Sequence, residues 1–421
     1  MNSGEIRLSL VIIGFCGDLP QEVRALSPFD GTPPSDARMR SLVCQHLDGQ
    51  PITHEFRTTQ HLIGPAAHAE RHEGLMRKAI DAARAAGVRV WLLSEGWTTS
   101  DFDDVMYCPS DERVNRWYEA LYVHIASHYG AEALDITHAR YPMTSRRRGM
   151  FVCTCDRCAR SAAAMGYDMA QMKADLQDAL AKLGAIGAER LESVAREALG
   201  AQDWVQLLDL RSGVLDWFRF RAELLASRFA RFREAVHAAA GADFVFGSDT
   251  YPPSLALFAG HNLSHWSEFS DFASPLISHV DIFQMHTLVV WARLLQAAIP
   301  GLTEKAALQV VYRFVGYDRL GMPDNISDFR LGSLDVEPGY SKDHECEFKN
   351  VPLRDLLMLD MAKARLYLPE DMPSYPIIQG GGSPHNWPRE IIEEVIAGAQ
   401  ALGHQGVMLQ GTRALVDFEL K

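Results

Sequence analysis

The residues whose chemistry is clearest are four cysteines. Cys153, Cys155 and Cys158 are spaced C-x-C-x-x-C, and Cys108 lies upstream in Tyr-Cys-Pro-Ser. Four thiolates are the number that a tetrahedral zinc ion needs, and they leave no open position for water, so we expect a structural zinc. The alternative is four ordinary buried thiols, but three of them within six residues and beside charged residues are a poor core pattern.

The remaining cysteines, Cys16, Cys44 and Cys346, are scattered, and we expect them to be free. Seven cysteines are an odd number, and four of them have metal spacing rather than the pattern of a disulfide framework. This usage is typical of a reducing compartment and predicts a cytoplasmic protein.

A second group of candidate residues follows apolar segments that read as buried strands. These segments cover 8–13, 88–94, 133–139, 243–247, 280–285, 308–314, 375–379 and 407–410. Helical patterns between or after them cover 66–86, 111–129, 156–165, 213–240, 265–277, 289–298, 351–367 and 389–402. Alternating strands and helices predict an α/β fold with a parallel sheet, and eight such units predict a closed (β/α)8 TIM barrel. We expect one barrel domain over 1–421, with insertions at 15–65, 167–212 and 316–350.

In such a barrel the residues that do chemistry lie at the carboxyl ends of the strands. Glu95 and Asp249 each close an apolar strand, and strands two and four lie close enough for their carboxylates to face each other across a sugar. We therefore predict Asp249 as nucleophile or base and Glu95 as acid, with His138 as a further catalytic candidate. The alternative for each carboxylate is a structural salt bridge. Asp135 is expected at a strand start, on the face that serves stability.

Other strand-end and loop residues suit substrate binding. Arg140 offers a fixed fork of donors, and aromatic loop residues can stack on sugar faces or simply pack. The candidates are Arg140, Tyr141, Trp97, Tyr251, His286, Arg313, Gln379 and Trp387.

Composition and charge exclude some partners. The 421 residues carry a formal net charge of −13, which argues against nucleic acid and anionic membranes. No apolar run approaches the roughly 20 residues of a membrane span. The short apolar run near the N-terminus reads as a first strand and not as a signal peptide.

The two cysteine segments, with the helix and strand between them, resemble family 42 glycoside hydrolases. Tyr107-Cys108-Pro109-Ser110 and the C-x-C-x-x-C motif match that family's zinc cluster, and the resemblance covers roughly residues 88–412. It implies a β-galactosidase-type barrel, a carbohydrate substrate and a homo-oligomer, a trimer or a dimer. The chain departs from the family where it matters for catalysis. Thr137-His138-Ala139-Arg140 stands where the family carries an Asn-Glu pair, and Gln379 stands near its nucleophile position.

The expected function is cleavage of a glycosidic bond in a small saccharide or oligosaccharide. Because few carboxylates stand at the strand ends, two alternatives remain. One is a sugar lyase or isomerase that uses His138, His286 and Tyr141 for proton transfer. The other is a non-catalytic barrel that binds carbohydrate.

Overall fold

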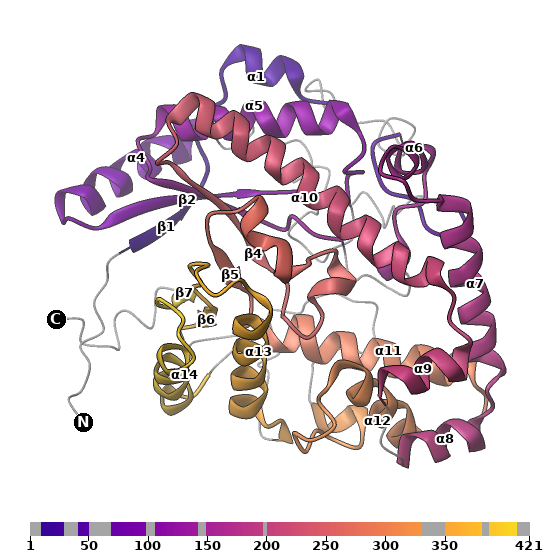
Figure 1. Cartoon of the computed structure of the whole chain (residues 1–421). Coiled ribbons are helices and arrows are strands. Elements are labelled where there is room, and N and C mark those ends of the chain that lie inside the picture. The colour runs from indigo at the N-terminus through magenta and orange to yellow at the C-terminus, as the bar shows by residue number, and fades with distance from the viewer. Residues whose placement is uncertain are drawn as a thin grey trace.

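The computed structural model describes residues 10–28, 41–49, 69–97, 106–141, 149–196, 200–329, 350–380 and 387–410. Five parallel strands form one sheet in chain order (Figure 1): β1 (Leu10–Gly14), β2 (Arg89–Glu95), β3 (Ala133–Thr137), β4 (Val245–Thr250) and β5 (Ala273–Pro275). A second parallel pair consists of β6 (Ile377–Gln379) and β7 (Met408–Gln410). Six of the eight strands predicted from the sequence are confirmed by these elements.

The two sheets meet next to β5. Ala273 forms an isolated parallel bridge with Ser374, and Leu276 forms another with Ile377. Side chains from or beside all seven strands also form one apolar cluster, in which the Trp91 ring lies 4.6 Å from that of Phe272 and 5.9 Å from that of Tyr375. Strands that share one cluster on one face must curl around it. The five-stranded sheet is therefore a half-barrel with a concave, apolar inside.

Helices α4 (Ala69–Ala85), α5 (Glu112–His128) and α10 (Ser212–Ala240) pack against strands of the curl. The other helices of the described residues are α1 (Gln21–Leu26), α6 (Asp156–Ala164), α7 (Met169–Ala185), α8 (Ala188–Arg196), α9 (Ala201–Leu208), α11 (His286–Ala298), α12 (Glu304–Val315), α13 (Leu353–Tyr367) and α14 (Arg389–Ala401). The long helix α10 packs against α5 and α7, because its apolar residues recur at steps of three and four.

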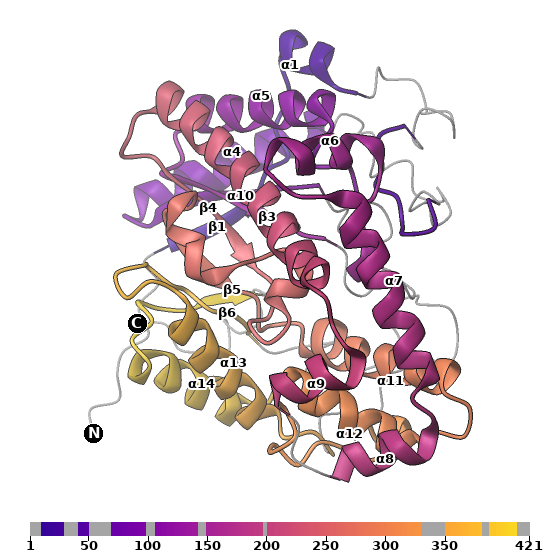
Figure 2. The ribbon, with the colours of Figure 1, turned by 45° about the vertical axis from the view of Figure 1, so that its right-hand side comes forward.

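The predicted insertion at 167–212 is helical. It forms α7, α8 and α9 between the cysteine segment and α10. Figures 1 and 2 show α7 running from α6 toward α8, which lies beside α12. The insertion thus connects the cysteine end of the molecule with the helices that follow β5.

Two of the predicted strands are wrong. Val280–Met285 is a π-helical segment that leads into α11, and the segment 308–314 lies inside α12. Short apolar runs cannot be assigned to strand or buried helix by periodicity alone. The residues at the two ends of α12 identify it as a helix. Thr303 caps its first turn by accepting a hydrogen bond from the Ala306 N–H at 3.3 Å, and Gly316 follows the last turn with φ 80°.

The predicted helix at 265–277 is also wrong. Leu263–Glu268 forms a 3-10 helix, and β5 follows at Ala273–Pro275. The described residues therefore contain seven strands and not the eight of a closed barrel. Within the same residues, no helix is both long and apolar enough to cross a membrane.

Candidate functional site

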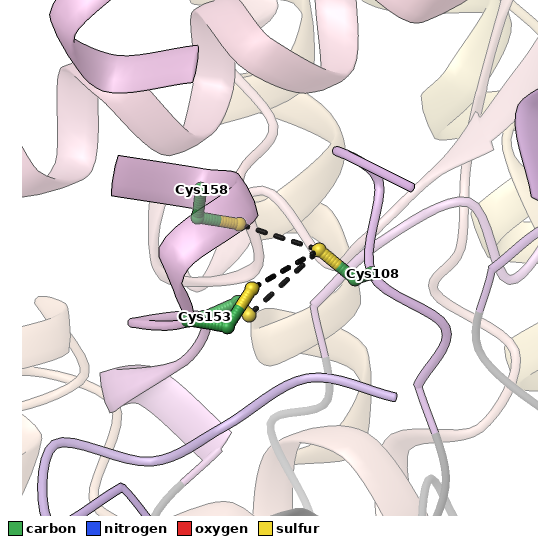
Figure 3. A group of neighbouring side chains, drawn as sticks. Cys108, Cys153 and Cys158 are labelled. Carbon is green, nitrogen blue, oxygen red and sulfur yellow. Dashed lines mark hydrogen bonds between the residues drawn. The ribbon is translucent and has the colours of Figure 1, made fainter. Parts of the chain in front are cut away.

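The four predicted cysteine ligands come together in the structure. Their sulfur atoms all lie within 4.8 Å of one another, and all four side chains are buried. Cys108 Sγ stands 3.4 Å from Cys158 Sγ, 3.6 Å from Cys155 Sγ and 3.9 Å from Cys153 Sγ (Figure 3). Cys108 lies between β2 and α5, while the other three lie at or just before the start of α6. The donor set fits one tetrahedral metal ion.

Positive groups surround this cysteine cluster. The Gln45 backbone N–H donates to Cys153 Sγ at 3.3 Å. The Arg157 guanidinium binds Asp111 Oδ2 at 2.5 Å and the Val43 carbonyl oxygen at 3.1 Å. Burial alone would lower the pKa of Arg157, but the charges of Cys108 and Cys155 raise it above its usual value. These contacts would offset the charge of a thiolate-bound metal ion.

A fifth cysteine, Cys44, lies beside the cluster, although the sequence analysis treated it as scattered. Its backbone N–H donates to the Met106 carbonyl oxygen at 2.9 Å, and the Cys108 N–H donates to the Leu42 carbonyl oxygen at 2.9 Å. The Cys44 thiol is fully buried and within hydrogen-bonding reach of Cys108 and Cys153. It stands outside the set of four mutually close sulfur atoms. Its position 64 residues before Cys108 gave no spacing signal.

A row of polar residues crosses the ends of β2, β3 and β4. Glu95 pairs in register with Thr137, and the Thr137 hydroxyl group donates to Asp249 Oδ2 at 2.7 Å. Side chains alternate along a strand, so these three point to the concave face that also holds the apolar cluster. Asp249 is buried, whereas Glu95 is exposed. The two predicted carboxylates thus flank Thr137 at one end of the half-barrel.

His138 extends this row. It adopts a left-handed backbone with φ 57°, which is uncommon outside glycine and marks strained, often functional positions. Its Nδ1 lies 3.2 Å from Thr137 Oγ1. Because the single Thr137 hydrogen goes to Asp249, Nδ1 of His138 is the donor at this contact, and Nε2 keeps its lone pair. Burial, and next the charges of Arg140 and His279, hold the pKa of His138 well below its usual range.

His279 repeats this arrangement after β5, and the sequence analysis did not single it out. Its Nδ1 lies 2.9 Å from Ser278 Oγ, whose hydrogen goes to Gln410 Oε1 at 2.8 Å. Gln410 pairs in register with Gln379, one of the predicted binding residues. A hydroxyl residue before a histidine thus recurs at the ends of β3 and β5. This repeat is the signal that could have identified His279.

Arg140 and Tyr251 lie together beside this row. The Arg140 guanidinium stands 5.2 Å from the centre of the Tyr251 ring and 5.0 Å from that of Phe283. The Tyr251 N–H donates to His261 Nδ1 at 2.9 Å, so His261 Nε2 is the donor to the Ala139 carbonyl oxygen at 3.1 Å. His261 therefore fastens the segment after β3 to the segment after β4.

Several predicted binding residues lie elsewhere. Trp97 is buried in the core, where its Nε1 donates to Asn115 at 3.0 Å and its ring stacks on Phe232. Tyr141 is buried under the Arg221 guanidinium, 4.1 Å from the centre of the Tyr141 ring. These surroundings leave neither aromatic face available for a sugar.

The remaining binding candidates belong to the second half of the chain. Trp387 is buried with the apolar side chains around α13 and α14. His286 begins α11, and Arg313 lies within α12. The strand-end position for which His286 and Arg313 were selected is therefore wrong for both.

Asp135 was expected at a strand start, on the stability face, but it lies in the middle of β3. By alternation it points to the same concave face as Ala133 and Thr137. Asp135 is 1% exposed, and the backbone N–H of Asp249 lies within hydrogen-bonding reach of its carboxyl group. A third carboxyl group therefore lies on the face that carries the candidate site.

No protein-family model matches the chain, and no curated protein matches it. Among solved structures, it is similar to the glycoside hydrolase domain of PgaB (BpsB) from Bordetella bronchiseptica, at 10% identity and TM-score 0.45, over 98% of this chain and 96% of that one. It is also similar to the catalytic domain of beta-amylase from Paenibacillus polymyxa, at 11% identity and TM-score 0.33, over 81% and 80% of the two chains. A third similar structure is alpha-L-fucosidase isoenzyme 2 from Paenibacillus thiaminolyticus, at 12% identity and TM-score 0.27, over 97% of this chain and 64% of that one. At such low TM-scores and identities, the likeness assigns no activity and no residue roles to this chain.

Proposed function

We propose that this protein cleaves a glycosidic bond in a small saccharide or oligosaccharide, with Glu95 and Asp249 as the two carboxyl groups. The observation that carries the proposal is the row Glu95–Thr137–Asp249 across three neighbouring strands. Neighbouring strands lie about 4.8 Å apart, so the backbones of β2 and β4 stand about 10 Å apart. Inward-pointing carboxyl groups on that spacing fit the roughly 5 to 10 Å that separates the pair in glycoside hydrolases.

The surroundings suggest a role for each group. Asp249 is buried and held by the Thr137 hydroxyl group, which suits a nucleophile or base of fixed orientation. Glu95 is exposed, which suits an acid that exchanges protons with solvent and with the leaving oxygen. Neutral His138 would bind a sugar hydroxyl group through Nε2, and Arg140, Tyr251 and Gln379 would line the site.

The four clustered cysteines would hold a structural zinc ion. Thiolate ligands suit zinc, and four of them complete its shell, so the ion would stabilise the loops after β2 and β3 and take no part in the reaction. The cysteine cluster is also the feature in which the chain resembles family 42. Its homo-oligomeric state, a trimer or a dimer, is part of the same proposal.

One observation favours a second candidate function, a sugar lyase or isomerase. His138, Thr137 and Asp249 form a chain of hydrogen bonds that ends in a neutral imidazole, and such a group could remove a proton from carbon. A third possibility is binding of carbohydrate without turnover.

Incubation with a panel of oligosaccharides and aryl glycosides in water enriched in oxygen-18 separates the three functions. Hydrolysis places one labelled oxygen in the released sugar, which mass spectrometry detects. A lyase gives an unsaturated product and an isomerase a product of unchanged mass, both without label from bond cleavage. Heat of binding in calorimetry without any product identifies a binding protein.

A further inference from the structure

The carboxyl group of Asp135 has surroundings that the proposed pair of carboxylates does not explain. It is 1% exposed in the middle of β3. The backbone N–H of Asp249 lies within hydrogen-bonding reach of its carboxyl group. Its Oδ1 has no hydrogen-bond partner among the described residues. An ionised carboxylate that is buried with so few hydrogen-bond donors around it would be strongly unfavourable. The protonation state of Asp135 therefore has to be considered.

Among the described residues, the neighbours of Asp135 in its own layer of the concave face carry no charge. Its register partner is Gly247, which has no side chain, and a Cβ there would lie 2.5 Å from the Phe272 ring. Below it stands the apolar cluster with Trp91 and Ala133. In this layer of the half-barrel, as far as the structure describes it, no charged side chain favours a negative charge on Asp135.

Other titratable and charged groups stand at the strand ends above Asp135. They are Glu95 at the end of β2, Asp249 on β4, His138 and Arg140 after β3, and His279 after β5. The described residues on the concave sides of β1, β6 and β7 near this level, Gly14, Gln379 and Gln410, are uncharged. Burial raises the pKa of Asp135 well above its usual range and the charge of Asp249 raises it further, while the Asp249 N–H opposes both.

We propose that Asp135 and Asp249 form a pair of carboxyl groups that together carry a single proton. In this pair Asp135 is a positioning residue, which acts on the reaction through Asp249. Asp135 keeps the proton and accepts the Asp249 N–H. This fixes the strand end that carries the Asp249 side chain. Because Asp135 is then uncharged, the single negative charge of the pair stays on Asp249, next to the Thr137 hydroxyl group. Two ionised carboxylates on neighbouring strands, on one buried face, would oppose each other.

The first test needs no substrate, and it measures the free energy of unfolding against pH for wild type and D135N. The pKa of Asp135 in the folded protein lies above its unfolded value of about 3.9. Its contribution to the free energy of unfolding is therefore complete below about pH 3.9 and is lost as the pH rises toward the folded-state pKa. The Asn side chain removes this loss and can still accept the Asp249 N–H. D135N should therefore gain stability over wild type progressively from about pH 4 upward.

Two variants make this test specific. Asp271 is a carboxylate that is ion-paired with Arg233, so D271N should lose stability near neutral pH. In a D249N background the charge that opposes ionisation of Asp135 is gone, so the pH-dependent gain from D135N should shrink. An equal gain in both backgrounds, or a stability loss in D135N that grows with pH, would overturn the pair.

The second test rests on the proposed function and uses the pH profile of kcat/KM on a glycoside that the enzyme cleaves. D135N should retain activity within about tenfold, and its activity should persist to higher pH, because the second ionisation of the pair is absent. D135L, which cannot accept the Asp249 N–H, should lose at least tenfold more. Identical profiles for wild type and D135N would refute the positioning role. If no glycoside is cleaved, the proposed function fails while the unfolding data still decide the pair.

Discussion

The hydroxyl group of Thr137 donates a hydrogen bond of 2.7 Å to Oδ2 of Asp249 and so joins the ends of β3 and β4. The same hydroxyl oxygen lies 3.2 Å from Nδ1 of His138. One small side chain therefore orients both the carboxylate and the imidazole of the candidate site.

Replacing Thr137 by Val keeps the shape of the side chain and removes the hydroxyl group. A hydrogen bond to a charged acceptor contributes about 1.5 to 3 kcal/mol, so T137V should lower kcat by roughly tenfold to a hundredfold at similar KM. T137S keeps the hydroxyl group and should stay near wild type. Steady-state kinetics of the three proteins check this. A loss in T137S, with T137V near wild type, would show that the methyl group, and not the hydrogen bond, matters.

The cysteine cluster predicts that four of five buried cysteines bind the metal ion and that the fifth does not. Cys108, Cys153, Cys155 and Cys158 form the close set, and Cys44 is their buried neighbour. Elemental analysis of the purified protein should find one zinc ion per chain, which C108S and C158S lose. C44S is the matched control and should keep the metal. Equal metal content in C108S and wild type would contradict the assignment of the ligands.

Removal of the metal should also loosen the segment around Cys44. Residues 41–46 hydrogen-bond to the Met106–Cys108 segment on one side and to Thr154 on the other. A chelator should therefore increase hydrogen exchange in these segments and lower the unfolding temperature. Unchanged exchange there would show that the loops hold each other without the ion.

His261 should make stability depend on pH on the acid side. Burial lowers its pKa to about 3, although the hydrogen bond to the Ala139 carbonyl oxygen opposes this. The unfolded state binds a proton near pH 6.5 and the folded state does not, so this contribution is complete above pH 6.5 and is lost as pH falls toward 3. H261N, whose amide oxygen can accept the Tyr251 N–H, should be less stable at pH 7.5 and show a flatter decline. Parallel declines in the two proteins would contradict the assignment.

The sequence predicted those parts of the fold whose signals are local. Six strands and the cysteine ligands were identified, because apolar runs and C-x-C-x-x-C spacing are visible along the chain. The segments 280–285 and 308–314 were misassigned because an apolar run fits a buried helix equally well. Their place in the structure depends on a helix cap at Thr303 and on packing against distant helices.

The candidate site was predictable only in part, for a related reason. Glu95 and Asp249 could be found because a strand-end carboxylate is visible in the sequence. The contact between Asp135 and Asp249 depends on the register of β3 against β4, and the position of Cys44 depends on how residues 41–49 fold back onto the cluster. Neither relationship has a local signal.

The most direct test of the proposed function is kcat on the best cleaved glycoside for wild type, D249N and E95Q, with D271N as a control for an acidic residue outside the site. Loss of an acid or base group removes roughly a hundredfold to ten-thousandfold of the rate. We predict a decrease in that range for both D249N and E95Q, with D271N near wild type and all three variants folded by circular dichroism. Activity of D249N and E95Q within about twofold of wild type would contradict the proposed function.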